Sequence, residues 1–162
     1  MKCAIGQDSH AFYQKLGKPL ILGGVRIMNG QPLKGNSDAD VILHALTNAI
    51  SGITGVNILG AIADEMCMNH NITDSSAYVK EALKYLTGHK IKHVSFSVEC
   101  LQPKLANYIH DIRKSIADLL AIDIGSVGLT AHSGEDLTLF GRGKGILCTC
   151  IITVESKNLS NG

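Results

Sequence analysis

The sequence contains few aromatic residues and few prolines. It has no tryptophan, three phenylalanines, four tyrosines and three prolines, while 45% of its 162 residues are hydrophobic. Aliphatic side chains must therefore fill most of the core. The length is typical of one domain, which we expect over residues 1–156, followed by a frayed tail at 157–162.

The chain also lacks a strong charge of either sign and a long apolar run. Its formal net charge is +1, and lysines and arginines form no obvious cluster. Nucleic-acid binding requires a concentrated basic surface, so we expect no nucleic-acid partner. The longest apolar run is the nine-residue ILCTCIITV at 146–154. A membrane-spanning helix needs about 20 such residues, so this run predicts a buried strand and no membrane partner.

The cysteines do not form a disulfide pattern. There are five, an odd number, and no two are spaced as CxxC. Cys148 and Cys150 lie two apart in a strand-like run, so their side chains share one face in poor geometry for a bridge. This usage indicates a reducing compartment and predicts a cytoplasmic protein.

The hydrophobic pattern predicts a mixture of strands and helices. Alternating or continuous apolar stretches predict strands at 2–10, 92–100, 126–132 and 145–156, and a hairpin over 18–28 that turns at Gly23–Gly24. Helical spacing predicts helices over 41–53, 74–86 and 103–122, with 55–72 irregular. The fold class is therefore α/β, an α+β sandwich with a mixed β-sheet whose helices pack on one face. Residues 145–154 are apolar on both faces, so another subunit is expected to cover the other face.

The expected helix boundaries depend on capping residues. Asn36 or Ser37 is a suitable N-cap for the first helix, with Asp38 and Asp40 in its first turn. An alternative is that Ser37 and Asp38 mark a helix N-terminus that faces an anion. Pro103 opens the third helix, where proline is tolerated.

Asp8 and His10 are the first candidates for chemistry. They lie two apart in a strand, so both side chains point to the same face. His44, on the buried first helix, is the best third ligand, and Asp40 lies four residues earlier and is expected to orient its imidazole. Two histidines and a carboxylate with an open fourth position are typical of catalytic zinc. The alternative is that His44 is an ordinary core histidine.

Two further segments offer weaker signals. Glu135, in SGEDL at 133–137, is a candidate ligand for a harder cation such as Mg²⁺, or simply a turn carboxylate. The segment FGRGKG at 140–145 resembles a phosphate loop but precedes a strand rather than a helix. It is therefore interpreted as a turn or bulge.

Five segments together match a known family. They are DSH at 8–10, SDADVILHALTNAISG at 37–52, TDSSAYVKEAL at 73–83, QPKL at 102–105 and GRGKG at 141–145. In this order and spacing the chain resembles the 2-C-methyl-D-erythritol 2,4-cyclodiphosphate synthases of non-mevalonate isoprenoid biosynthesis. The resemblance implies a homotrimer with active sites between subunits. The implied reaction converts 4-diphosphocytidyl-2-C-methyl-D-erythritol 2-phosphate to the cyclic diphosphate and CMP, by attack of the 2-phosphate on the β-phosphorus.

The resemblance also assigns site residues. It implies zinc at Asp8, His10 and His44, Mg²⁺ or Mn²⁺ at Glu135, and phosphate contacts at Ser37 and Ser133. The cytidine pocket of the neighbouring subunit would comprise Cys100, Leu101, Gln102, Pro103, Lys104, Leu105 and Ala106. The other expected substrate-binding residues are Asp8, His10, Asn36, Gly60, His132, Gly134, Glu135 and Arg142, with Asn36 and Ser133 as catalytic candidates. Whether Arg142 and Lys144 bind a regulatory phosphate in a central channel stays open.

The chain departs from the family pattern at four places. Asn36 replaces a histidine, Asn48 replaces a frequent aspartate, Ile58-Leu59-Gly60 replaces D-I-G, and residues 132–135 replace T-T-T-E while keeping a hydroxyl and a carboxylate. Asp64 or Glu65 is the candidate to replace the carboxylate missing at Ile58. We therefore expect a divergent member whose metal site is complete and whose sugar site is altered. Two alternatives follow: an enzyme for a related nucleotide-diphosphate polyol, or a non-catalytic zinc trimer that binds a nucleotide or isoprenoid phosphate.

Overall fold

Four strands form one mixed sheet, which confirms the predicted fold class. The computed structural model describes residues 1–14 and 17–157. The strands, in their order across the sheet, are β1 (Lys2–Ala11), β6 (Gly145–Ser156), β4 (His89–Glu99) and β5 (Val127–His132). β6 is antiparallel to both of its neighbours, whereas β4 and β5 are parallel. The long apolar run is thus a central strand, as its composition predicts.

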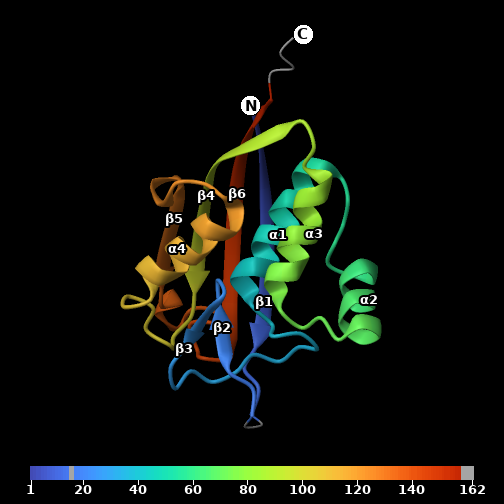
Figure 1. Cartoon of the computed structure of the whole chain (residues 1–162). Coiled ribbons are helices and arrows are strands. Elements are labelled where there is room, and N and C mark those ends of the chain that lie inside the picture. The colour runs from blue at the N-terminus through green and yellow to red at the C-terminus, as the bar shows by residue number, and fades with distance from the viewer. Residues whose placement is uncertain (15–16, 158–162) are drawn as a thin grey trace, which may run out of the picture.

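Helices cover one face of this sheet (Figure 1). The helices are α1 (Val41–Thr54), α2 (Ala61–His70), α3 (Ser75–Tyr85) and α4 (Ile109–Leu120). α1 packs on β1 and β6, α3 packs beside α1, and α4 packs on β5. Between helices and sheet, the side chains of Val94, Phe96 and Val98 are buried on β4, as are those of Cys148 and Cys150 on β6.

Strand β1 and helix α1 approach each other closely at Gly6. A Cβ atom built there would lie 2.2 Å from the carbonyl oxygen of Ala45 and 2.3 Å from the amide nitrogen of Ala49. Only a residue without a side chain fits in this space. The contact holds α1 directly over the strand that carries Asp8 and His10.

The opposite sheet face is less covered by the chain itself. Ile5 and Ile151 are register partners on β1 and β6, and they are 66% and 49% exposed. Cys148 and Cys150 point to the helices, so the uncovered face of β6 carries the alternate residues instead, among them Thr149. That a second subunit covers this face stays a prediction.

A short hairpin precedes α1 and is tied to it. Strands β2 (Leu20–Leu22) and β3 (Val25–Ile27) pair in antiparallel register, and both turn residues, Gly23 and Gly24, have positive φ. This confirms the predicted glycine turn. Both glycine N–H groups donate to the Asp40 carboxylate, at 2.8 and 2.7 Å.

Three local predictions were wrong. The expected irregular stretch 55–72 contains α2, which begins after Gly60 without a side-chain cap and buries only Ala63, so its pattern is weak. Helix α4 begins at Ile109 rather than at Pro103, and residues 100–108 form turns that bury Leu105. Helix α1 is capped by Asp40, whose side chain accepts from two of its first N–H groups, and not by Asn36 or Ser37.

No helix in the described part of the chain is both long and apolar enough to span a membrane. The terminal segment expected to fray lies, from residue 158 onward, outside the described residues. Residue 157 follows β6 directly and its amide donates to the carbonyl of Gly88 at 2.8 Å.

Candidate metal centre and adjoining pockets

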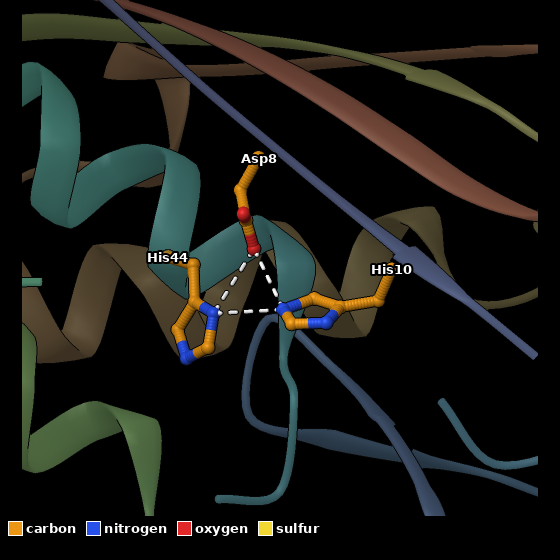
Figure 2. Close-up of side chains that lie close together, drawn as sticks. All are labelled: Asp8, His10 and His44. Atoms are coloured by element: carbon orange, nitrogen blue, oxygen red, sulfur yellow. Dashed lines mark hydrogen bonds and ion pairs between the residues drawn. The ribbon is translucent and has the colours of Figure 1, made fainter. Parts of the chain in front are cut away.

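Asp8, His10 and His44 converge as the sequence predicts (Figure 2). β1 supplies Asp8 and His10 from its helix-facing side, and α1 supplies His44. Asp8 Oδ2 lies 2.9 Å from His10 Nε2 and 3.0 Å from His44 Nδ1, and the two imidazole nitrogens are 3.2 Å apart. One oxygen and two nitrogens therefore surround a single point at the end of the strand.

This donor set fits a tetrahedral metal ion. Carboxylate oxygen and imidazole nitrogen bind Zn²⁺ at roughly 2.0–2.2 Å, which places neighbouring ligand atoms of a tetrahedral site about 3.3–3.6 Å apart. The observed separations of 2.9–3.2 Å are only slightly shorter. The structure therefore contains three arranged ligands for a divalent metal and leaves a fourth direction toward the pocket.

The triad perturbs the ionisation of its members. Burial raises the pKa of Asp8, but hydrogen bonding to His10 and His44 and their positive charge outweigh it, and the pKa falls to about 2. The hydrogen bond to Asp8 raises the pKa of His10 despite partial burial. Asp8 is therefore a carboxylate anion at neutral pH, the form that binds a cation.

A cavity of about 220 Å³ opens beside the triad. Gly35, Asn36 and Ser37 line one side, and Leu59, Gly60, Ala63, Asp64 and Cys67 line the side formed at the start of α2; Tyr78 completes the lining. The structure thus brings the predicted residues Asn36, Ser37 and Gly60 to the metal ligands. Ile58 is fully buried and does not line the cavity.

Of the α2 residues that line this cavity, the sequence indicates only Asp64, as one of two candidates to replace the carboxylate missing at Ile58. Asp64 and Cys67 lie one helical turn apart on a helix that was not predicted. Glu65, beside Asp64, is absent from the residues that line the cavity. Burial and the neighbouring Cys67 raise the pKa of Tyr78, so its hydroxyl stays protonated and donates to the carbonyl of Ile72 at 2.8 Å.

The predicted role of Asp40 is corrected. Its Oδ1 accepts from the amides of Gly23, Ile42 and Leu43, and its Oδ2 accepts from Gly24. Burial raises the pKa of Asp40 to about 6, against the lowering effect of these amides. Asp40 caps α1 and holds the hairpin, because an N-cap side chain turns back toward the helix start and not along it to residue i+4.

The groups that actually contact the outer nitrogens of the histidines come from elsewhere. His10 Nδ1 lies 2.8 Å from the carbonyl oxygen of Lys34, and His44 Nε2 lies 2.9 Å from Ser75 Oγ on α3. Asp38 in turn accepts from the Ser75 hydroxyl. No spacing in the sequence indicates these contacts, because they join segments more than 20 residues apart.

A second cavity of about 220 Å³ lies at the opposite edge of the sheet. Its lining joins the loop before α4 to the end of β5: Cys100, Pro103, Lys104, Leu105, Ala106, Ile109, Ala131, His132 and Ser133. Most of the predicted cytidine-binding segment is therefore brought together. Leu101, Gln102 and Arg142 line instead a separate cavity of about 490 Å³, which Pro103 also lines.

Glu135 lies on a strained turn beside the second cavity. Gly134, Glu135 and Asp136 all have positive φ, which is uncommon for residues with side chains. The Ser133 hydroxyl donates to Glu135 Oε1 at 3.0 Å, and Thr138 donates to the buried Glu99 below the turn. The structure therefore places Glu135 with Ser133 and not with the metal ligands.

The two cavities are far apart within one chain. Asp8, Cys148, Val98 and Ala131 form one row across β1, β6, β4 and β5. Three strand spacings of roughly 4.8 Å separate Asp8 from Ala131 by about 14 Å, and paired residues share a face. Both cavities thus open on the helix-covered side at the same end of the sheet, but at opposite edges.

Comparison with known proteins gives consistent matches over almost the whole chain. The model of the YgbB family matches residues 1–155. A curated relative named 2-C-methyl-D-erythritol 2,4-cyclodiphosphate synthase, from Chlamydia caviae, is 46% identical over 155 residues, which cover 94% of this chain and 88% of the relative.

Two solved structures share the fold. The IspF of Plasmodium falciparum, solved as a CDP complex, is 28% identical with a TM-score of 0.80, and the match covers 97% of both chains. The bifunctional IspDF from Campylobacter jejuni is 28% identical with a TM-score of 0.86. That match covers 96% of this chain, which spans only 42% of the bifunctional one.

Proposed function

The chain belongs to the YgbB family, and on this basis we propose that it acts as a 2-C-methyl-D-erythritol 2,4-cyclodiphosphate synthase. The observation that carries the proposal is the convergence of Asp8, His10 and His44 on one point of a cavity that Asn36 and Ser37 also line. In the proposed reaction, a 2-phosphate oxygen of 4-diphosphocytidyl-2-C-methyl-D-erythritol 2-phosphate bonds to the β-phosphorus. The bond from the β-phosphorus to the bridging oxygen breaks, and its electron pair leaves with CMP, a phosphorus–oxygen lyase reaction.

We propose that Asp8, His10 and His44 hold Zn²⁺ and that Glu135 holds Mg²⁺ or Mn²⁺. When bound, these ions supply Lewis-acid stabilisation to phosphate oxygens that would otherwise repel each other. The chain itself needs no nucleophile, because the attacking oxygen belongs to the substrate. Its task is to orient the two phosphates in line and to shield them from bulk water.

The polar groups beside these ligands suit phosphate. Asn36 is exposed at the cavity and carries an amide that donates without a charge. The Ser37 hydroxyl accepts from the amide of Ala39 at 3.1 Å, so its own proton is free to point toward a phosphate oxygen. We assign Asn36 and Ser37 to one phosphate, and Ser133 with His132 and Gly134 to the other.

The second cavity suits a cytidine nucleotide. Its wall includes Cys100 and residues 103–106, and burial raises the pKa of the Cys100 thiol to about 11, which keeps this thiol uncharged at neutral pH. Lys104 is exposed at the rim, where its charge can pair with the diphosphate. The CDP complex of the Plasmodium falciparum relative supports a cytidine nucleotide as the type of ligand.

We propose that the complete site forms between neighbouring subunits of a homotrimer. The two cavities lie at opposite edges of one sheet, so an active site needs the metal ligands of one chain and the nucleotide wall of another. Coverage of Ile5 and Ile151 on the open sheet face would stabilise this assembly. We assign residues 1–156 to the catalytic domain, and the five free cysteines support a cytoplasmic location.

Turnover of the cytidyl substrate tests the proposal. Zinc-loaded protein, shown by light scattering to be a trimer, is mixed with the substrate and Mg²⁺ or Mn²⁺, and ³¹P NMR follows CMP and the cyclic diphosphate. We expect both products in equal amounts. Faster CMP or UMP release from another nucleotide-diphosphate polyol would point to a related enzyme. Nucleotide or isoprenoid-phosphate binding without turnover would identify a non-catalytic trimer.

A further inference from the structure

The imidazole of His44 is held from both of its nitrogens. Nδ1 faces the metal-ligand cluster, 3.0 Å from Asp8 Oδ2, while Nε2 lies 2.9 Å from Ser75 Oγ at the start of α3. Ser75 is fully buried, and His44 is 8% exposed. Water therefore has little access to Nε2, so the Ser75 hydroxyl determines whether this nitrogen donates or accepts a hydrogen bond.

The direction of this hydrogen bond follows from the next residue in the chain of contacts. The Ser75 hydroxyl contacts Asp38 Oδ1, and the Ser75 amide donates to Asp38 Oδ2 at 3.0 Å. An ionised carboxylate only accepts, so the single hydroxyl proton of Ser75 points to Asp38. The Ser75 oxygen must then accept from His44, which places a proton on Nε2 and leaves Nδ1 as the nitrogen that can bind an ion once its contact with Asp8 is given up.

The outer nitrogen of His10 is also held by a hydrogen-bond acceptor, but this acceptor belongs to the backbone. Its Nδ1 lies 2.8 Å from the carbonyl oxygen of Lys34, which also only accepts. A proton of His10 is therefore on Nδ1, which leaves Nε2 as the nitrogen that faces the cluster and can bind an ion. A backbone carbonyl fixes the ring of His10, whereas the side chains of Ser75 and Asp38 fix the ring of His44. Substitution can therefore remove only the contacts that fix His44.

We propose that Ser75 and Asp38 are positioning residues of the metal centre, which fix the tautomer and ring orientation of His44 so that Nδ1 is presented to the ion. The inference rests on the metal site of the proposed function, and it concerns metal binding rather than turnover. Outer groups of this kind raise metal affinity by preparing the ligand before the ion arrives.

Zinc affinity of the full-length protein is the primary test, measured by competition with a chromophoric chelator. Ser75→Ala and Asp38→Asn are each expected to weaken zinc binding by about 10- to 100-fold. Ser75→Thr keeps the hydroxyl and is expected to restore most of the affinity. Asp74→Asn is the matched control, because Asp74 caps the same helix through the amide of Ser76 at 2.8 Å and does not contact Ser75 Oγ.

A second readout separates positioning from a general loss of structure. In metal-free protein at pH 8, ¹⁵N shifts of labelled histidine report which ring nitrogen carries the proton. We expect His44 Nε2 to carry a proton in the wild type, and to lose it in part of the population in Ser75→Ala, where only Nδ1 still donates, to Asp8. His10 should keep its tautomer in both, because its partner is a backbone carbonyl.

The outcomes separate this inference from the proposed reaction. Weakened zinc binding in both variants with a shifted His44 tautomer supports the inference even if no CMP is released by the wild type. Affinity within twofold of the wild type and an unchanged tautomer would overturn it, whatever the activity. Wild-type protein that binds no zinc would overturn it as well.

Discussion

The two cavities are built on different principles. In the metal cavity, three ligands stand on a strand and a helix and contact one another at 2.9–3.2 Å. In the second cavity, which we propose binds the nucleotide, most of the lining comes from loops, and the adjoining turn that carries Glu135 has three consecutive residues at positive φ. The first is arranged before any ligand binds, whereas the second depends on a strained turn.

The difference suggests a division of labour between the two sides of the proposed subunit boundary. Regular elements hold charged ligands within a fraction of an ångström, which a metal ion requires. Loops adapt better to a flexible nucleotide, and they tolerate substitution more readily. A site with metal ligands on regular elements and nucleotide contacts on loops can keep its metal chemistry while its substrate contacts diverge.

The largest effect is expected from His44→Ala, which removes a metal ligand and leaves the lining of the second cavity unchanged. Loss of one of three ligands should abolish zinc binding and reduce kcat/KM for CMP release by roughly 10³-fold. CDP affinity should fall much less than turnover, since the proposed cytidine contacts come from the lining of the second cavity, which does not include the metal ligands. Metal analysis, turnover and calorimetric titration with CDP measure the three quantities.

His110→Ala is the control for this variant, because His110 is exposed on α4. It should retain both zinc and activity. A His44→Ala protein that still turns over at the wild-type rate would contradict the metal-centred interpretation of this cavity.

Glu135→Gln is the corresponding test beside the second cavity. It removes the charge that would hold Mg²⁺ or Mn²⁺ but keeps the size of the side chain, so we expect roughly a 10²-fold loss of kcat with the zinc content unchanged. Steady-state kinetics against Mg²⁺ concentration measures this effect.

Asp136→Asn provides the neighbouring control, since its carboxylate is 82% exposed and lies 3.5 Å from Arg142 Nε. Equal losses in the two variants would mean that the turn needs negative charge in general, and that Glu135 has no specific role as a ligand.

The smallest effect is expected from a substitution of Asp64, in the wall of the cavity that holds the metal ligands. Asp64 is the carboxylate that α2 presents to this cavity, where the polyol hydroxyls of the substrate would lie. Asp64→Asn should raise KM by roughly tenfold, the cost of weakening hydrogen bonds to a charged group, with little change in kcat. Glu65→Gln, one residue away and outside the lining, should leave KM unchanged.

Much of the metal site was predictable because it follows from periodicity. Alternation along β1 places Asp8 and His10 on one face, and helical spacing places His44 on the buried side of α1. The sequence also contains the turn glycines that set the β2–β3 hairpin. These features depend on residues close in sequence, which the pattern reports directly.

The remainder depends on contacts between distant segments. Ser75 meets His44 only because α3 packs beside α1, and Asp40 turns to the hairpin because its carboxylate is surrounded by backbone amides. Helix α2 escaped prediction because it buries little, and the loop before α4 because a proline there resembles a helix start. Neither propensity nor spacing contains this tertiary information.

Because of the close contact at Gly6, the arrangement of the metal ligands depends on the distance between β1 and α1. Asp8 has a short side chain, and it reaches His44 because β1 and α1 pack so closely that the space beside Gly6 cannot hold even a methyl group. Any residue larger than glycine would lift the helix and pull the ligands apart. Metal affinity could thus be tuned, or lost, at a position that never touches the ion.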